Sequence, residues 1–227
     1  MDIKKLQALV IDALEDVKAQ EIRVYDTTHL TSMFDRIAIA SGTSNRQTKA
    51  LASSVRDKVK AAGTRFAFIK ATEGGDIVDP AFAMNWQLAA RHGVRRGAYH
   101  FFYHCRPARE QARWFIRHVP RSAGALPPVL DMEWTPTSPT CRIRRDPATI
   151  RAEARDFLRV VEAHYGQRPI IYTTIDFWRD NEMWKAGPYP FWLRSTAAHP
   201  EDLYAGRHWT FWQYTSTGRV PGIGGDV

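Results

Sequence analysis

The chain has 227 residues, with 32 Lys and Arg against 24 Asp and Glu, a net charge of +8 and 44% hydrophobic residues. This composition indicates a globular protein that is long enough to bury a core, and it excludes fibrous and disordered classes. No apolar run approaches the ~20 residues that a bilayer span needs, and the first residues lead into an amphipathic segment instead of a signal-peptide stretch. We therefore expect no membrane partner and a cytoplasmic location.

The composition changes abruptly near residue 63. Residues 1–63 hold six Lys, four Arg and no Trp, Pro or Cys, whereas residues 64–227 hold two Lys, twenty Arg and all of the Trp, Pro and Cys. A single evolved domain seldom changes its basic residue in this way. We therefore predict two domains, 1–63 and 64–227, although no Pro/Gly/Ser linker marks the joint.

The first domain is predicted to have the order α-β-β-α. Apolar residues with helical spacing predict a helix over 3–18, and β-branched residues that alternate with polar or small ones predict strands over 22–26 and 36–40. Ser44 to Gln47 has the form of a capping box and predicts that a helix follows, ending at Gly63.

Two stretches of this domain are similar to a known family. The order Ile22 to Asp26, then Phe34-Asp35-Arg36 through Ser41-Gly42-Thr43-Ser44-Asn45-Arg46-Gln47, resembles the amino-terminal half of the bacterial ribosomal silencing factor (Iojap-like family). The match covers residues 1 to about 62. It implies that 1–63 binds the large ribosomal subunit and blocks subunit joining, although the later strands of that fold do not follow Ala62. Equally, the polar residues of the motif could only cap a helix and be solvated.

The second domain alternates apolar strands with amphipathic helices. Strands are predicted over 66–71, 97–102, 128–133, 169–173, 191–193 and 210–214, and helices near 82–92, 109–119 and 150–165. Near-continuous apolar strands separated by helices favour a parallel sheet that is buried on both faces, most simply a (β/α) barrel. In such barrels the chemistry gathers where strands end.

Asp131 and Glu133 stand at such a strand end. Residues two apart on a strand project to the same face, ~6 to 7 Å apart, so both carboxylates can converge on one bound group. A pair of this kind suits glycosidic-bond chemistry, with one acid protonated and the other ionised. The pattern alone is weak, because carboxylates at strand ends also cap helices or bind cations.

Six motifs in chain order make the pattern more specific. They are Lys-Ala-Thr-Glu-Gly at 70–74, Asp-Pro-x-Phe at 79–82, Gly-Ala-Tyr-His-Phe at 97–101, Pro-Val-Leu-Asp-Met-Glu at 128–133, Ile-Tyr-Thr at 171–173 and Trp-Gln-Tyr at 212–214. Together they resemble glycoside hydrolase family 25, the Chalaropsis-type lysozymes, over about 61–227. That resemblance implies an α/β fold of the modified (β/α) barrel type that cleaves the β-1,4 bond between N-acetylmuramic acid and N-acetylglucosamine in peptidoglycan. It implies neither a metal nor an organic cofactor.

The resemblance also implies roles for individual residues. Glu133 would be the general acid and Asp131 its partner, as nucleophile or as support for the substrate acetamido group. We expect Tyr99, His100, Tyr172, Trp212 and Glu73 in substrate binding, although aromatic residues at strand ends also serve as core and Glu73 could merely orient a loop. Cys105 and Cys141 follow neighbouring strands, so their loops could be bridged by a disulfide, whereas in a reducing cytosol they would stay thiols. No nucleic-acid-binding motif accompanies the Arg-rich composition.

Two acidic motifs of this family are not found. Its first strand normally carries Gly-x-Asp-x-Ser, which nothing before Phe66 supplies, and its last carries Asp-x-Asn, which would come just after Gly224 to Val227. We therefore expect an incomplete barrel and weak or no turnover. The β-α-β order of 36–40, 45–62 and 66–71 could replace the missing first unit, with Ser41 or Ser44 near the absent Asp. The alternatives are a ribosome-binding regulator and an inactive chimeric product; a wall-directed enzyme would also need export or release by lysis.

Overall fold

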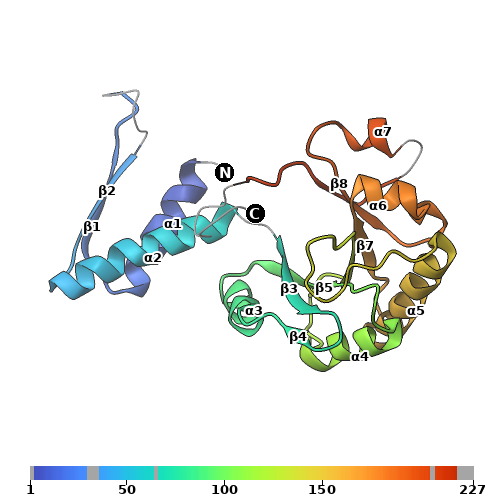
Figure 1. Ribbon diagram of the computed structural model, residues 1–227. Coiled ribbons are helices and arrows are strands. Elements are labelled where there is room, and N and C mark those ends of the chain that lie inside the picture. Colours follow the sequence, from blue (N-terminus) through green and yellow to red (C-terminus); the bar gives the residue numbers. More distant parts are fainter. Residues whose placement is uncertain (1–2, 30–35, 64–65, 205–207, 219–227) are drawn as a thin grey trace. The chain divides into compact units, whose positions relative to one another are not determined.

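The computed structural model describes residues 3–29, 36–63, 66–204 and 208–218 (Figure 1). The chain divides into two compact units, and the second of them begins at Phe66, close to the predicted joint at residue 63. We call residues 3–63 the amino-terminal unit and residues 66–218 the carboxyl-terminal unit. The motif residues Phe34 and Asp35 and the last residues, Gly224 to Val227, lie outside the described parts of the chain.

The amino-terminal unit has the predicted α-β-β-α order. Helix α1 (Ile3–Asp16) is followed by strands β1 (Gln20–Asp26) and β2 (Arg36–Ser41), and then by helix α2 (Asn45–Gly63). The Ser44 hydroxyl accepts a hydrogen bond from the Gln47 backbone N–H (3.2 Å), so the predicted cap of α2 is confirmed. The Gln47 side chain accepts from Thr43 rather than Ser44, which is one residue away from the reciprocal bond of a capping box.

Strand β2 belongs to a two-stranded sheet of the amino-terminal unit. It pairs antiparallel with β1, and Tyr25 lies opposite Ile37. The strands recorded beside β3 in the described chain are β4 and β5. The ladders recorded in the described residues thus pair 36–40 with β1, and the replacement of the missing strand by 36–40 stays a prediction. A connection of nine residues joins β1 to β2, so closing that ladder costs less chain entropy than pairing β2 across the whole of α2.

The carboxyl-terminal unit is the predicted α/β fold, with alternating strands and helices. Its strands are β3 (Phe66–Glu73), β4 (Ile77–Val78), β5 (Arg95–Phe101), β6 (Val129–Met132), β7 (Ile170–Thr173), β8 (Phe191–Arg194) and β9 (Phe211–Gln213). Its helices are α3 (Phe82–Arg91), α4 (Ala108–His118), α5 (Pro147–Tyr165), α6 (Ile175–Asp180), the 3-10 turn η1 (Met183–Lys185) and α7 (Pro200–Leu203). The sequence patterns missed only short elements: β4, α6, η1 and α7.

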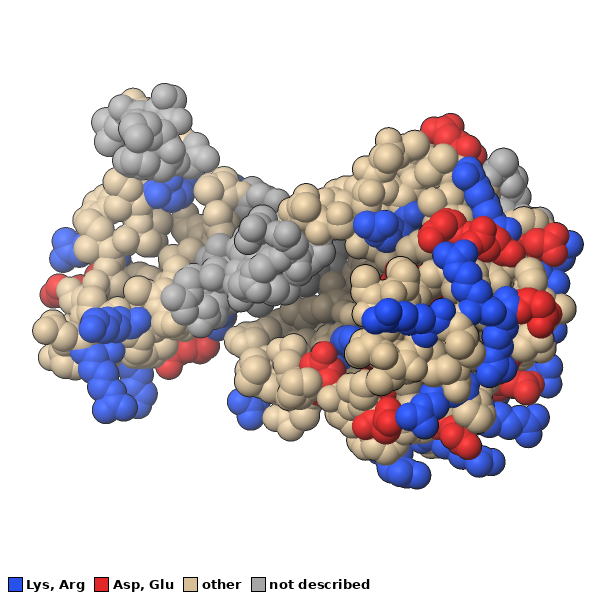
Figure 2. Space-filling view, in the orientation of Figure 1, with Lys and Arg blue, Asp and Glu red and all other residues tan. Residues whose placement is uncertain are grey.

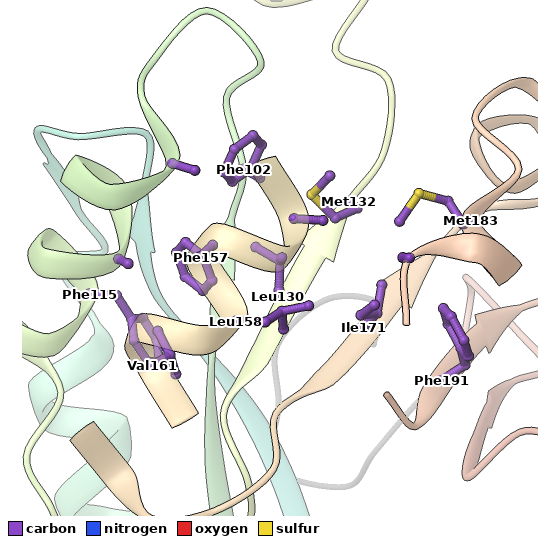
Figure 3. Close-up of a cluster of buried hydrophobic side chains, with 14 of the residues drawn as sticks. Phe102, Phe115, Leu130, Met132, Phe157, Leu158, Val161, Ile171, Met183 and Phe191 are labelled. Atoms are coloured by element: carbon purple, nitrogen blue, oxygen red, sulfur yellow. The ribbon is translucent and has the colours of Figure 1, made fainter. Parts of the chain in front are cut away.

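The seven strands form one sheet in the order β4-β3-β5-β6-β7-β8-β9. Every neighbouring pair is parallel except β3 and β4, which are antiparallel. Helices cover the outer face, where Leu130 and Met132 of β6 and Ile171 of β7 pack against Phe157 and Leu158 of α5 (Figure 3). Burying each such side chain contributes about 2 kcal/mol, so this core fixes which face of β6 points inward.

Contacts between aromatic rings on the inner face join the two ends of the curved sheet. The rings of Phe66 and Phe211 lie 5.3 Å apart, and those of Phe68 and Trp192 lie 5.0 Å apart. These contacts join β3 to β8 and β9, at the other end of the strand order, although no ladder between β3 and β9 is recorded in the described residues. Side chains, not backbone hydrogen bonds, therefore bridge the place where a complete barrel would hold further strands.

Basic side chains are spread over the visible surface and are interleaved with acidic ones on the carboxyl-terminal unit (Figure 2). Several are ion-paired, for example Arg145 with Glu153 (2.9 Å) and Arg151 with Glu182 (3.2 Å). Within the described ranges, no helix has the length and apolar character needed to cross a membrane.

Candidate active site

Strand β6 places the two predicted carboxyl groups. All four of its residues are buried, and their side chains alternate between the inner and the outer face. Asp131 lies in register between Phe101 of β5 and Tyr172 of β7, on the inner face. Glu133 follows directly after the strand and is partly exposed. The more accessible carboxyl group therefore stands at the mouth, and the deeper one stands beneath it.

The environment raises the pKa of both carboxyl groups. Burial raises the pKa of Asp131 well above its usual range, and the Glu133 charge raises it further, whereas Lys70 opposes the shift. Burial also raises the pKa of Glu133, against the opposing charge of Arg194. Each of the two carboxyl groups affects the pKa of the other. Asp131 is only 7% exposed, and within the described structure its Oδ1 atom has no hydrogen-bond partner. Two carboxyl groups at one strand end, both with raised pKa values, can divide the roles of acid and anion between them.

Glu73 is tied to its neighbours rather than open to a ligand on every side. Its carboxylate accepts a hydrogen bond from the Lys70 ammonium (2.6 Å) and another from the Tyr103 hydroxyl. Burial raises the pKa of Glu73, but these two hydrogen bonds outweigh it and hold the pKa below its usual value. Glu73 is therefore an anion that positions Lys70 beside Asp131.

Two tyrosines lie beside the carboxyl pair. Burial raises the pKa of Tyr99, and the charges of Asp131 and nearby carboxylates raise it further. Tyr172 shows the same dependence on burial and on Asp131, and its hydroxyl donates to Gln213 Oε1 (2.7 Å). Both phenols therefore stay protonated and face the inner side of the sheet with the carboxylates.

Two predicted site residues lie elsewhere. His100 is 0% exposed, its ring nitrogens lie at Thr72 Oγ1 (2.8 Å) and Gln111 Oε1 (3.1 Å), and burial lowers its pKa to about 4. Because His100 alternates with Tyr99 along β5, it points into the helix-covered core and not into a groove. Trp212 alternates with Gln213 in the same way. Its indole N–H donates to the Ser195 carbonyl (2.7 Å), and it lies on the face opposite the carboxylates.

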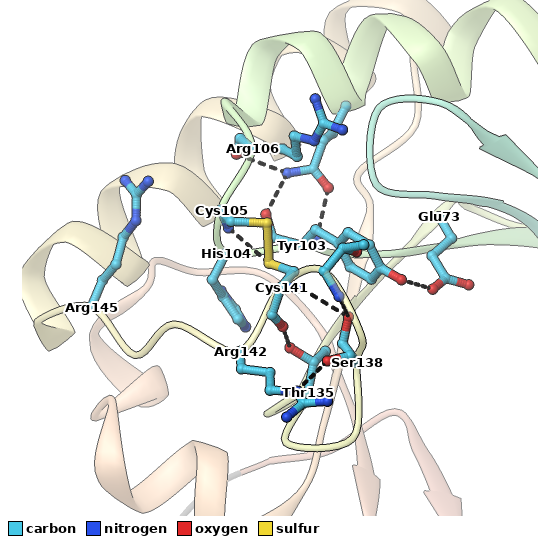
Figure 4. The surroundings of a disulfide bond; sticks show 12 residues. Glu73, Tyr103, His104, Cys105, Arg106, Thr135, Ser138, Cys141, Arg142 and Arg145 are labelled. Atoms are coloured by element: carbon cyan, nitrogen blue, oxygen red, sulfur yellow. Dashed lines mark hydrogen bonds between the residues drawn. A yellow bond between two sulfur atoms is a disulfide. The ribbon is translucent and has the colours of Figure 1, made fainter.

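A disulfide and a buried histidine hold the loops under the site (Figure 4). Cys105 and Cys141 are bonded, and this joins the loop after β5 to the loop after β6. The preceding residue, His104, is fully buried, and its Nε2 lies 3.0 Å from the Glu133 backbone carbonyl. His104 stacks on Phe177 (5.2 Å). The contact between His104 and the Glu133 carbonyl fixes the backbone that carries the Glu133 side chain.

Sequence reasoning missed His104, Tyr103, Gln213 and Arg194. Arg194 was within reach of the pattern, because it follows Trp192 by two residues and so shares its face. The other three act through contacts with residues far away in the chain, as Gln213 of β9 does with Tyr172 of β7, and one sequence holds no signal for such contacts. In the described residues no group of three or more His, Cys, Asp or Glu could hold a metal ion.

Residues 50–223 match the model of Glycosyl hydrolases family 25. The protein YegX of Escherichia coli K12 is 39% identical over 163 residues, 72% of this chain and 57% of YegX. Lysozyme M1 of Streptomyces globisporus is 37% identical over 180 residues, 74% of this chain and 60% of that lysozyme. The chain thus spans less than two thirds of the length of either relative.

A solved structure and a second family complete the comparison. The family 25 glycosyl hydrolase from Bacillus anthracis has a TM-score of 0.66 and 35% identity, and the match covers 75% of this chain and 77% of that one. The ribosomal silencing factor RsfS of Chromobacterium violaceum is 46% identical over 78 residues, 34% of this chain and 64% of RsfS. Both predicted resemblances are therefore confirmed. With three quarters of its length matched by the family model, the chain belongs to glycosyl hydrolase family 25.

Proposed function

We propose that the carboxyl-terminal unit is a muramidase, which hydrolyses the β-1,4 bond between N-acetylmuramic acid and N-acetylglucosamine in peptidoglycan. The observation that carries this proposal is the carboxyl pair at the end of β6, with Asp131 buried on the inner face and Glu133 partly exposed just after the strand. Membership of a family whose relatives include lysozymes supports the choice of substrate.

The different exposure of the two carboxyl groups assigns them different roles in the reaction. Glu133 is the accessible one, and it donates its proton to the glycosidic oxygen as the bond from that oxygen to the sugar carbon breaks. Asp131, ionised at that moment, stabilises the positive charge that develops at the sugar carbon. Lys70 favours that ionised form. Water then adds to the sugar carbon, and its proton restores Glu133.

We propose further that turnover is slow. The family resemblance implies a carboxylate from a first barrel strand, whereas the segment before Phe66 is of the silencing-factor type and its strand β2 pairs with β1. Because peptidoglycan lies outside the cytoplasm, action on it also requires export or release by lysis.

The test is the release of reducing muropeptides from purified peptidoglycan. We expect slow release by the wild-type protein and none by Glu133→Gln. Glu110→Gln, which changes an exposed carboxylate on α4, is the matched control and should release as much as the wild type. Folded wild-type protein that releases nothing would overturn the proposal.

The amino-terminal unit carries a second candidate function, binding to the large ribosomal subunit. One face of the β1–β2 ladder exposes three apolar side chains: Tyr25 (46%), Ile37 (38%) and Ile39 (54%). Adjacent exposed apolar residues of this kind often mark a protein contact. Co-sedimentation with ribosomes, in an Asp131→Ala, Glu133→Ala background, separates this activity from hydrolysis. Loss of co-sedimentation in Ile39→Ser would support it, and no co-sedimentation by the parent chain would exclude it.

A further inference from the structure

Arg194, the last residue of β8, faces the carboxyl pair. Trp192, two residues earlier, packs against Tyr172 on the inner face (5.0 Å between ring centroids). Because side chains alternate along a strand, Arg194 points to that same face. Its ladder partner is Gln213, which holds the Tyr172 hydroxyl. Arg194 thus stands at the mouth of the site, beside residues that line it.

The charged groups around the mouth differ in how they are paired. The pKa of Glu133 responds to the positive charge of Arg194 and to the negative charge of Asp176. The other cation at the site, Lys70, is already paired with Glu73 at 2.6 Å. Arg194 is partly exposed, and among the described residues no ion pair of its side chain is recorded. Its guanidinium N–H donors are therefore available to an anion that enters the mouth.

We propose that Arg194 is a specificity-determining residue that binds a carboxylate on the muramyl side of the glycan. This inference rests on the proposed function and deepens it. N-acetylmuramic acid differs from N-acetylglucosamine by a lactyl ether that ends in a carboxyl group. Where a stem peptide is attached, this carboxyl group is consumed as an amide, and the carboxylates are then those of the peptide. A guanidinium binds such a group through two parallel hydrogen bonds. Arg194 therefore selects acidic peptidoglycan strands over neutral chitin-like strands.

The position of Arg194 also links binding to acid catalysis. In the free protein its positive charge lowers the pKa of Glu133 against the effect of burial. A substrate carboxylate on the guanidinium neutralises that charge, so the Glu133 pKa rises and the carboxyl group holds the proton that it must donate. The acidic substrate thereby prepares its own general acid, and a neutral glycan does not.

The test compares ligands that differ in charge. The non-hydrolysing Glu133→Gln protein and its Arg194→Met derivative are titrated by calorimetry with three compounds. These are the disaccharide of N-acetylglucosamine and N-acetylmuramic acid, its lactyl methyl ester, and the disaccharide dipeptide. Arg113→Met, which removes an exposed arginine on α4, is the charge-matched control. Charge-assisted hydrogen bonds of this kind change affinity by about 10- to 100-fold.

We expect Arg194→Met to weaken binding of the free-acid disaccharide at least about ten-fold more than binding of its ester. A selective loss seen only with the dipeptide would instead place the bound carboxylate on the stem peptide. Equal changes for all three ligands would overturn the proposal, because a merely structural arginine would act on each alike. Binding that discriminates charge in a protein that releases no muropeptides would refute the muramidase activity and leave this site standing.

A second measurement tests the effect of Arg194 on the protonation of Glu133. In a protein that does release muropeptides, Arg194→Met should move the alkaline limb of the pH profile to higher pH, since Glu133 then keeps its proton longer. An unchanged limb, alongside an unchanged limb in Arg113→Met, would contradict the link between Arg194 and Glu133.

Discussion

Replacement of both cysteines by serine should lower the stability of the carboxyl-terminal unit. The disulfide joins Cys105 and Cys141 across 36 residues of sequence. Closing a loop of that length in the unfolded chain corresponds to about 4 kcal/mol at 25 °C in the chain-entropy model. This is a large part of the stability of an ordinary domain, about 5 to 15 kcal/mol. The double variant should therefore fold, but with a narrow margin.

The local geometry should survive the loss of the bond. The Thr135 hydroxyl donates to the Cys141 carbonyl (2.6 Å), and the Ser138 hydroxyl accepts from the Cys141 backbone N–H (3.1 Å). These bonds hold the loop after β6 without the sulfur bridge. His104 also keeps its contact with the Glu133 backbone, because that contact lies within the folded core. We therefore expect stability to fall much more than activity does.

Urea unfolding followed by tryptophan fluorescence measures the effect. The oxidised wild type should unfold at a clearly higher urea concentration than either the reduced wild type or the Cys105→Ser, Cys141→Ser protein. A reductant should leave the double variant unchanged, which controls for other effects of the reductant. If the oxidised and the reduced wild type unfold at the same midpoint, either the disulfide is absent or the entropic reasoning is wrong.

Three further changes test the interior of the same unit. His104→Phe leaves the Glu133 carbonyl without its donor and should cost about 1 to 3 kcal/mol in urea unfolding; His104→Gln should recover part of this. Because burial lowers the pKa of His104, the wild type should lose stability as the pH falls below 6.5, and His104→Gln should lose less. Equal losses of stability in the two proteins would count against this reasoning. Asp131→Asn should be more stable than the wild type at pH 7 but not at pH 4, because a carboxyl group with a raised pKa lowers folded stability only when the pH rises above the usual pKa of that group. A higher melting temperature of the variant at both pH values would contradict this reasoning. Gly97→Ala places a Cβ 2.5 Å from the Phe68 ring and should destabilise the fold by about 1 to 3 kcal/mol, whereas an unchanged melting temperature would mean that the ring moves freely.

Short apolar runs, and in residues 1–63 the alternation of β-branched with polar or small residues, were sufficient to predict every strand of four or more residues in the described chain. The apolar runs were sufficient because strands such as β6 are buried on both faces, with Val129 in the inner cluster and Leu130 in the outer core. Short elements such as α6 and α7 were missed, since a helix of one or two turns has too few residues to show a period. The position of the carboxyl pair was also predictable, because the two acids stand two residues apart at the end of one strand.

Residues that act through distant partners could not be placed from the sequence. His100 and Tyr99 are neighbours in a motif, yet one enters the core and the other the site, and the deciding factor is which face of β5 the helices cover. Strand β2 pairs with its near neighbour β1, because a ladder across a short connection closes at a low entropic cost. Local pattern thus determines the elements and the chemistry of the acids. Packing between elements determines which other side chains lie beside the acids. Burial, charge and hydrogen bonding at the acids depend on segments that are far apart in the sequence, and no local pattern links such segments.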